Sequence, residues 1–197
     1  MGTESLRRRG MRLAVLIVVW DLIEGVVAVT AGLAAGSIAL VGFGIDSTIE
    51  VFAASVVIWQ LRSGGDRRRR PALRAIAVTF LLLAAYVAIE AGTALLGGAD
   101  AESSPVGIVL NVVALVVMVP VAVAQSRTGT DLGNEVLIAQ AEETWLSNAL
   151  SINVLVGLGL NAVFGWAWAD PLVALVVAGF AAYAGVDAWR EASEDER

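Results

Sequence analysis

The segment IALVGFGIDSTIEVFAASVVIWQL, residues 38–61, is apolar over a length that suits a membrane-spanning helix of about 20 residues. Its only acidic or basic groups are Asp46 and Glu50, which lie near the middle of the run. These acids are four residues apart, so a helix places them on one face, one turn apart. The segment therefore predicts a transmembrane helix with two carboxyl groups at mid-membrane depth.

Five further apolar stretches of comparable length lie on either side of this segment. Each must be helical if it crosses lipid, because the bilayer core offers no hydrogen-bond partners to an open backbone. Turn-forming residues separate them: residues 34–37 form a very short hairpin, residues 63–65 are Ser-Gly-Gly, and Asp170-Pro171 is typical of a helix start. We therefore expect an all-α membrane protein, a six-transmembrane-helix bundle whose other spans are residues 13–33, 72–96, 106–124, 136–164 and 171–189.

The composition agrees with this fold class. Of the 197 residues, 58% are hydrophobic and 16% are charged, whereas a soluble domain carries about 25% charged residues. The mean hydropathy is +0.78. The chain has no Cys, so disulfides and the redox compartment stay undefined. It also has no His, which excludes imidazole zinc sites, serine–histidine catalysis and histidine proton relays.

The basic residues, all of which are arginine, predict the topology. They lie before the first span, between the second and third, between the fourth and fifth, and after the sixth. With six spans these four regions share one side, while the opposite loops carry Asp100, Glu102 and Asp170 and no basic residue. The positive-inside rule then puts both termini in the cytoplasm and the chain in the inner membrane. The thirteen arginines are Arg7, Arg8, Arg9, Arg12, Arg62, Arg67, Arg68, Arg69, Arg70, Arg74, Arg127, Arg190 and Arg197.

This topology defines three regions: a basic cytoplasmic N-terminus (1–12), a six-helix transmembrane domain (13–190) and a short cytoplasmic tail (191–197). The arginines before the first span also resemble the start of a signal peptide. That span is long enough to cross the membrane and lacks a clear cleavage site, so we interpret it as a helix. The arginine run at 67–70 fits topology and contact with anionic lipid, and we expect no nucleic-acid partner.

Acidic groups inside the spans carry the functional information. A charge at the bilayer centre costs roughly 2.5–3.5 kcal/mol on insertion scales, and no arginine lies at comparable depth to pair with these acids. They must therefore face the bundle interior and take up protons or a cation. Two carboxylates on one face, with a third from a facing helix, would suit a divalent cation. The seven acids are Asp21, Glu24, Asp46, Glu50, Glu90, Glu142 and Glu143.

The other acids leave alternatives open. Asp21 and Glu24 share one face of the first span and either support a site from behind or line an ion or proton path. Glu142 and Glu143 point about 100° apart, so at most one of them faces the same site. Glu142 is also a candidate for the ion or proton path. Glu90 lies toward the outer surface, where solvation is the simpler interpretation. Asn148, Asn153 and Asn161 could either ligate the ion or hold helices together by hydrogen bonds, and we favour the second role.

Two motifs resemble the cation diffusion facilitator family. SIALVGFGIDSTIE, residues 37–50, is similar to the family's second transmembrane helix, where an acid or His is followed by an acid four residues later; Asp46 and Glu50 occupy these positions. WADPLVALVVAG, residues 168–179, is similar to the start of the sixth helix. The family's fifth helix usually carries His or Asp and then Asp four residues on, and here Glu143 and Ser147 stand there.

The resemblance implies a transporter, with no covalent chemistry, that exchanges a divalent metal cation for protons. It implies Asp46 and Glu50 as primary ligands, Glu143 as a third and Ser147 as a weak fourth, and it implies a homodimer. No permanently bound cofactor is expected, since the metal is cargo. Without imidazole or thiolate, manganese, iron and cobalt become as credible as zinc. Family members usually continue into a cytoplasmic metal-binding domain; this sequence stops soon after Trp189, so a short form is expected.

Two rival functions are also compatible with the sequence. One is a proton-coupled exporter of organic cations, which would more often show an aromatic-lined cavity around one acid. The other is a membrane scaffold that transports nothing and tolerates loss of Asp46 and Glu50. An intramembrane protease is disfavoured, because His is absent and no aspartate pair carries the required motif.

Overall fold

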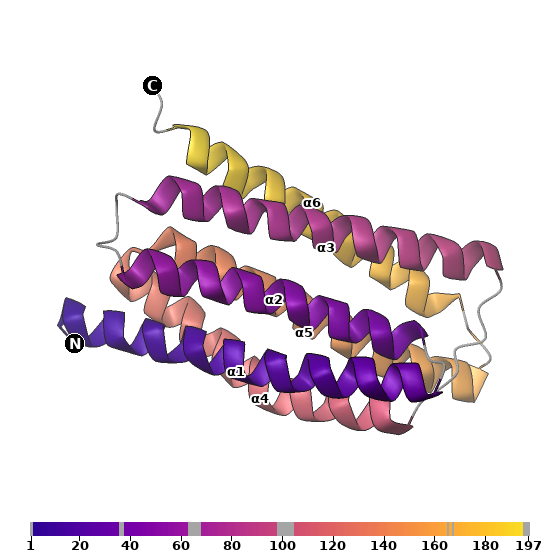
Figure 1. The fold of residues 1–197 in the computed structure, drawn as a ribbon. Helices are drawn as coiled ribbons and strands as arrows, with labels where there is room; N and C mark the ends of the chain where they lie inside the picture. Colours follow the sequence, from indigo (N-terminus) through magenta and orange to yellow (C-terminus); the bar gives the residue numbers. More distant parts are fainter. Residues whose placement is uncertain are drawn as a thin grey trace.

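The computed structural model describes residues 2–35, 38–62, 68–97, 105–164, 166 and 168–194. Over these residues the chain forms six α-helices and no β-strand, which confirms the predicted all-α bundle (Figure 1). Four residues on which the predicted topology rests lie outside the described part: Arg67, Asp100, Glu102 and Arg197. Residues 36 and 37 of the predicted short hairpin also lie outside it. The helices are α1 (Thr3–Ala35), α2 (Ile38–Arg62), α3 (Arg69–Gly97), α4 (Pro105–Leu132), α5 (Glu135–Phe164) and α6 (Ala169–Glu194).

Several helices are longer than the apolar stretches that predicted them. α1 begins at Thr3, and α4 continues to Leu132. Hydropathy marks only the part of a helix that suits lipid, whereas backbone hydrogen bonds continue through polar residues into the interface. At the other end of the bundle α6 begins at Ala169, so Asp170 lies in the first turn and is not the residue before the helix.

A tight turn joins α4 to α5. Gly133 adopts a positive φ of 63°, a conformation that glycine reaches without a Cβ penalty. Asn134 then caps α5, because its side-chain oxygen accepts a 2.9 Å hydrogen bond from the backbone N–H of Leu137. These two residues fold α5 back along α4, which brings the acids of α5 alongside the rest of the bundle.

The six helices pack as a group of four and a pair. α1, α2, α4 and α5 form a closed group, because α1 packs on α2 and α4, and α5 packs on α4 and α2. α3 and α6 are far apart in sequence but lie against each other, and they join the group through α2 and α5 (Figure 1). The acids of α1, α2 and α5 therefore meet inside the four-helix group.

The bundle has the properties of a membrane protein. Five helices, α1, α2, α3, α4 and α6, contain segments long and apolar enough to cross a membrane. Over its described residues α5 does not meet the same criterion, but it has 30 residues and lies alongside the others (Figure 1). Large apolar side chains are exposed along the bundle, including Val26, Ile89 and Phe180, as lipid-facing positions require.

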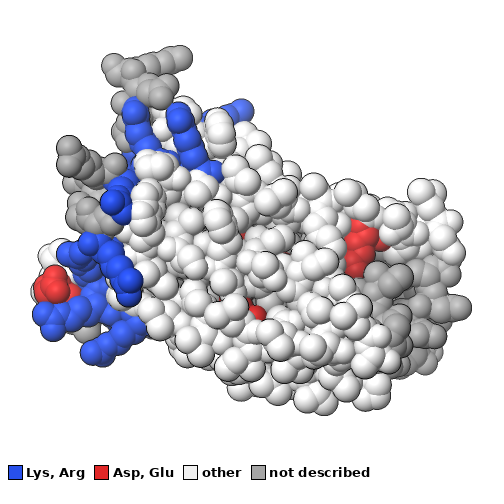
Figure 2. Space-filling view, viewed as in Figure 1, with Lys and Arg blue, Asp and Glu red and all other residues white. Residues whose placement is uncertain are grey.

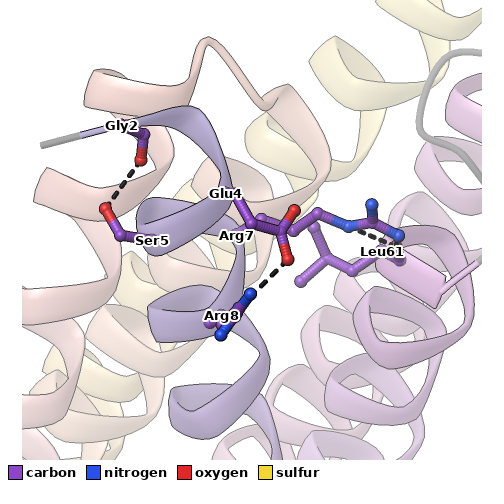
Figure 3. Close-up of polar contacts among 6 residues, drawn as sticks. All are labelled: Gly2, Glu4, Ser5, Arg7, Arg8 and Leu61. Atoms are coloured by element: carbon purple, nitrogen blue, oxygen red, sulfur yellow. Dashed lines mark hydrogen bonds and ion pairs between the residues drawn. The ribbon is translucent and has the colours of Figure 1, made fainter.

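Basic side chains gather at one end of the bundle, where both termini also lie (Figures 1 and 2). Arg7 of α1 donates from Nε to the carbonyl oxygen of Leu61 at 2.9 Å, at the C-terminal end of α2 (Figure 3). Arg69 forms an ion pair with Glu135, which joins α3 to α5. Arg74 lies over the ring of Trp189, which joins α3 to α6. These contacts hold several helix ends together in one basic layer, which we call the arginine end.

Glycines bring α1 and α2 close together beside the internal acids. A Cβ placed on Gly44 would lie 3.0 Å from the backbone oxygen of Gly25 and would overlap the side chain of Val29. Only a residue without a Cβ allows this approach. Since Gly25 follows Glu24 and Gly44 precedes Asp46 by two residues, the contact sets how near the acids of the two helices come.

A second close contact, between α3 and α6, gives a stability prediction. A Cβ on Gly185 would lie 3.0 Å from Cβ of Phe80 and 3.2 Å from the backbone oxygen of Ala77, whereas a Cβ on Gly179 meets nothing within 4 Å. We expect Gly185→Val to destabilise the protein by about 1–3 kcal/mol through overpacking. Thermal unfolding in detergent measures this, with Gly179→Val as the matched control on the same helix. Equal melting temperatures for the two variants would contradict this packing.

Candidate functional site

A small cavity lies inside the four-helix group, and acidic and amide side chains meet there. Its volume of about 10 Å³ is enough for one water-sized species. All four helices of the group contribute to the walls. The lining residues are Glu24 of α1, Phe43, Asp46, Ser47 and Glu50 of α2, Ala114 and Met118 of α4, and Ser147, Asn148 and Ser151 of α5.

A polar contact between Asp46 and Ser147 joins α2 to α5 across this cavity. The hydroxyl of Ser147 donates to Oδ2 of Asp46 at 2.8 Å. The other oxygen of Asp46, Oδ1, is buried without a hydrogen-bond partner. Asp46 therefore retains a lone-pair oxygen that can bind a cation, while Ser147 fixes the orientation of the carboxyl group.

Carboxyl oxygens without partners are the main chemical feature of this region. Asp21, Glu24, Asp46, Glu50 and Glu143 are each at most 7% exposed. Over the described residues, each has at least one buried oxygen that makes no hydrogen bond, and for Asp21 and Glu143 both oxygens are of this kind. Buried ionised carboxylates without partners are strongly unfavourable. Protons or a bound cation must therefore compensate these groups.

The acids occupy two levels, one helical turn apart. α1 and α5 run away from the arginine end, whereas α2 runs toward it. We call the level farther from the arginine end the outer level; it contains Glu24, Asp46 and Ser147. The level nearer to the arginine end is the inner level; it contains Asp21, Glu50 and Glu143. Charge interactions occur within each level, between Glu24 and Asp46 and between Glu50 and its neighbours Asp21 and Glu143. They also occur between the levels, since Asp46 interacts with Asp21, Glu50 and Glu143.

The structure brings together part of the ligand set that the sequence predicted. Asp46, Glu50 and Ser147 line the cavity together. Glu143 is buried at the inner level but does not line the cavity. In the described part of the chain, no three acidic side chains are close enough to hold one metal ion together. The described conformation therefore holds two acids and a hydroxyl of the predicted set around the cavity, with Glu143 beside them.

The residues predicted to form an ion or proton path separate into different places. Glu24 lines the cavity itself, and Asp21 lies at the inner level beside Glu50. Glu142 is exposed and interacts with Asp187 and Glu191 of α6, so it does not face the cavity. This agrees with the predicted 100° between Glu142 and its neighbour.

α5 adds an amide and a second hydroxyl group to the cavity wall, beside the predicted Ser147. The sequence favours a helix-packing role for Asn148, but this residue lines the cavity, and its Nδ2 has no partner. Ser151, which was not singled out, also lines it. The signal was present, because Ser147, Asn148 and Ser151 repeat at helical spacing and define one polar face. The side chain of Asn161 lies outside the described residues.

Comparisons with known proteins agree with this arrangement. Residues 14–195 match the family described as the cation efflux transmembrane domain. The chain is also 27% identical over 170 residues to an uncharacterized transporter, sll1263, of Synechocystis sp. (strain ATCC 27184 / PCC 6803 / Kazusa). That alignment covers 79% of this chain and 54% of the relative, so the chain spans about half the length of this curated relative.

The family match extends over nearly the whole chain and includes every helix that lines the cavity. It points to a transporter rather than an enzyme. The six-helix fold, the exposed apolar surface and the internal acids are consistent with that assignment. This chain is an integral membrane protein and belongs to the cation efflux transmembrane-domain family.

Proposed function

We propose that this protein exports a divalent metal cation from the cytoplasm in exchange for protons, with Asp46 and Glu50 as the main ligands. The observation that carries the proposal is the set of buried carboxyl oxygens without partners around a cavity of about 10 Å³. Ser147 supplies a neutral hydroxyl oxygen from α5, and Asn148 adds an amide group to the cavity wall. Glu24 of α1 also lines the cavity, and Glu143 is buried beside it at the inner level.

Exchange follows from the cost of charge inside a membrane. Carboxyl groups in the bundle are tolerated when they are protonated or when they bind a cation. A metal that binds must therefore release protons, and protons that bind must release the metal. Exposure of this site to one side of the membrane and then to the other, by rocking of helices, would make the exchange an antiport.

The ligand types narrow the choice of ion. Every polar group that lines the cavity binds through oxygen or is an amide, because the chain has neither His nor Cys. Oxygen ligands suit manganese, and iron and cobalt accept them as readily as zinc does. The proposal therefore includes Zn, Mn, Fe and Co as substrates.

Orientation and assembly belong to the same proposal. The arginine end would face the cytoplasm under the positive-inside rule, which puts the chain in the inner membrane and the cavity between the two leaflets. A homodimer is proposed from the family resemblance, and membrane lipid surrounds the apolar surface.

The size of the cavity disfavours export of organic cations. Space for one water-sized species suits a bare ion, whereas a drug-sized ligand occupies a pocket of about 300 Å³ or more. This cavity is also not lined by aromatic residues as expected of such an exporter, since Phe43 is the one aromatic residue among its described lining residues.

Metal uptake into proteoliposomes tests the proposed function. We expect purified protein to move at least one of Zn, Mn, Fe, Co or Cd faster than protein-free vesicles do, and an imposed pH gradient to increase the rate. A proton-sensitive dye should report proton movement in the opposite direction. Flux of a quaternary ammonium ion without metal would favour the organic-cation exporter. No flux of any tested ion would favour the scaffold.

A further inference from the structure

Two side chains of α3 meet over one glycine of α2, next to the proposed metal site. Gly42 precedes Asp46 by four residues, so it lies on the same face, one turn farther from the arginine end. A Cβ on Gly42 would overlap the hydroxyl oxygen of Tyr86 and would lie 3.3 Å from Oε1 of Glu90. Tyr86 and Glu90 are thus in contact with the backbone of α2, at a position where any larger residue would displace them.

Moving from Asp46 away from the arginine end, the next charged side chain along the described part of α3 is Glu90. It is the only charged residue between positions 75 and 97, and its carboxyl group interacts electrostatically with Asp46. Glu90 is partly exposed, whereas Asp46 is buried. A cation that leaves Asp46 on this side therefore meets Glu90 before it reaches the end of α3, where Leu95, Leu96 and Gly97 are exposed.

We propose that Tyr86 and Glu90 form an outer ion station: Tyr86 closes the route to Asp46 over Gly42, and Glu90 receives the cation as it passes. The inference rests on the proposed function for the identity and direction of the ion. A carboxylate and a phenol oxygen suit the same oxygen-binding cations as the cavity does. A site with one carboxylate and few other ligands binds a cation weakly, and weak binding allows the cation to leave quickly.

Electrostatics supports passage between the two acids. When both are ionised they repel each other, and a cation held near both removes that repulsion. A cation moving outward from Asp46 thus stays close to negative charge until it reaches the polar surface. Without Glu90, the same step along the described part of α3 would pass apolar residues with no compensating charge, since Glu90 is the only charged residue between positions 75 and 97.

Flux and binding measured on the same variants test the role of Glu90. We expect Glu90→Gln to lower metal flux in proteoliposomes by about 10-fold or more, while the Kd for Mn²⁺ or Zn²⁺ in detergent changes by less than about 3-fold. Asp187→Asn, an exposed acid on α6, is the matched control and should leave both unchanged. Two results would contradict the proposed ion station: an unchanged flux in Glu90→Gln, or a rise in Kd as large as the fall in flux.

Thiol access tests the closing role of Tyr86 without any transport. The chain has no cysteine, so Ser47→Cys places a single thiol in the cavity wall. A charged, membrane-impermeant methanethiosulfonate added at the outer face should react about 10-fold faster or more when Tyr86→Ala is added. Tyr183→Ala, the other tyrosine and an exposed one, should not change the rate. Equal reaction rates for Ser47→Cys alone, with Tyr86→Ala and with Tyr183→Ala would contradict the proposal that Tyr86 closes the route.

These two experiments separate the inference from the proposed function. A wild-type protein that moves no metal ion overturns the proposed function, and the thiol experiment then decides the closure by itself. A wild-type protein that moves metal at the same rate as Glu90→Gln leaves the proposed function in place and removes the station.

Discussion

The double variant Asp46→Asn/Glu50→Gln is expected to lose metal flux in proteoliposomes by at least about 100-fold relative to wild type. Both residues line the cavity, and each has a buried carboxyl oxygen without a hydrogen-bond partner. Removal of a group that only supports a metal ligand commonly costs 10–100-fold in affinity or activity. Removal of two charged ligands at once therefore costs at least as much.

The variant should remain folded, which makes the flux result interpretable. Asparagine and glutamine keep the shape of the original side chains and remove a buried charge that is costly without a partner. Ser147 can still donate its hydrogen bond to the amide oxygen at position 46. We therefore expect a melting temperature in detergent equal to or above that of wild type, and an unchanged elution volume on size exclusion.

A matched double variant controls for loss of charge alone. Asp187→Asn/Glu191→Gln removes one aspartate and one glutamate from exposed positions of α6 and should transport at the wild-type rate. Flux that survives in the Asp46/Glu50 variant would remove both residues from the transport site. It would also favour the scaffold function, which predicts tolerance of these changes.

Local periodicity was enough to predict the part of the site that one helix carries. Asp46 and Glu50 share a face because their spacing matches one helical turn, whatever surrounds them. The separation of Glu142 and Glu143 was predictable for the same reason, and the structure leaves one exposed and the other buried. The six helices were predictable because lipid requires a closed backbone and an apolar surface.

Contacts between helices could not be predicted in this way. Glu24 lines the cavity because Gly25 and Gly44 let α1 approach α2 closely, and only the packed structure shows which glycines meet. Asn148 is polar in either role, and its place in the cavity wall depends on the rotation of α5 about its axis. The packing of α3 on α2, which puts Glu90 near Asp46, is likewise a property of the whole bundle.

The second large effect is a gain of affinity at the position where this chain departs from the family pattern. Ser147→Asp is expected to lower the Kd for Mn²⁺ or Zn²⁺ by about 10-fold or more, because the charge of the ligands tunes metal affinity. Ser147 lies at the outer level, where its hydroxyl is 2.8 Å from Asp46 and Glu24 is the other acid. A carboxylate there would give the outer level three acids from three helices.

The size of this gain follows from competing terms. One added negative charge about 4 Å from a cation contributes a few kcal/mol at an effective dielectric of about 20. Desolvation of the new carboxylate and its repulsion from Asp46 take back part of that energy. A remainder of about 1.4 kcal/mol corresponds to a tenfold change in Kd. Ser147→Ala, which removes a neutral ligand and one hydrogen bond, should shift Kd in the opposite direction by a smaller factor.

Isothermal titration in two buffers of different ionisation enthalpy measures both the affinity and the protons released. We expect Ser147→Asp to release more protons per metal ion than wild type, since the third carboxyl group must be deprotonated to bind. Its flux should not rise in proportion, because tighter binding slows release of the ion. A Kd that is unchanged or weaker in Ser147→Asp, with the variant folded, would place the metal away from Ser147 and remove the outer level from the binding site.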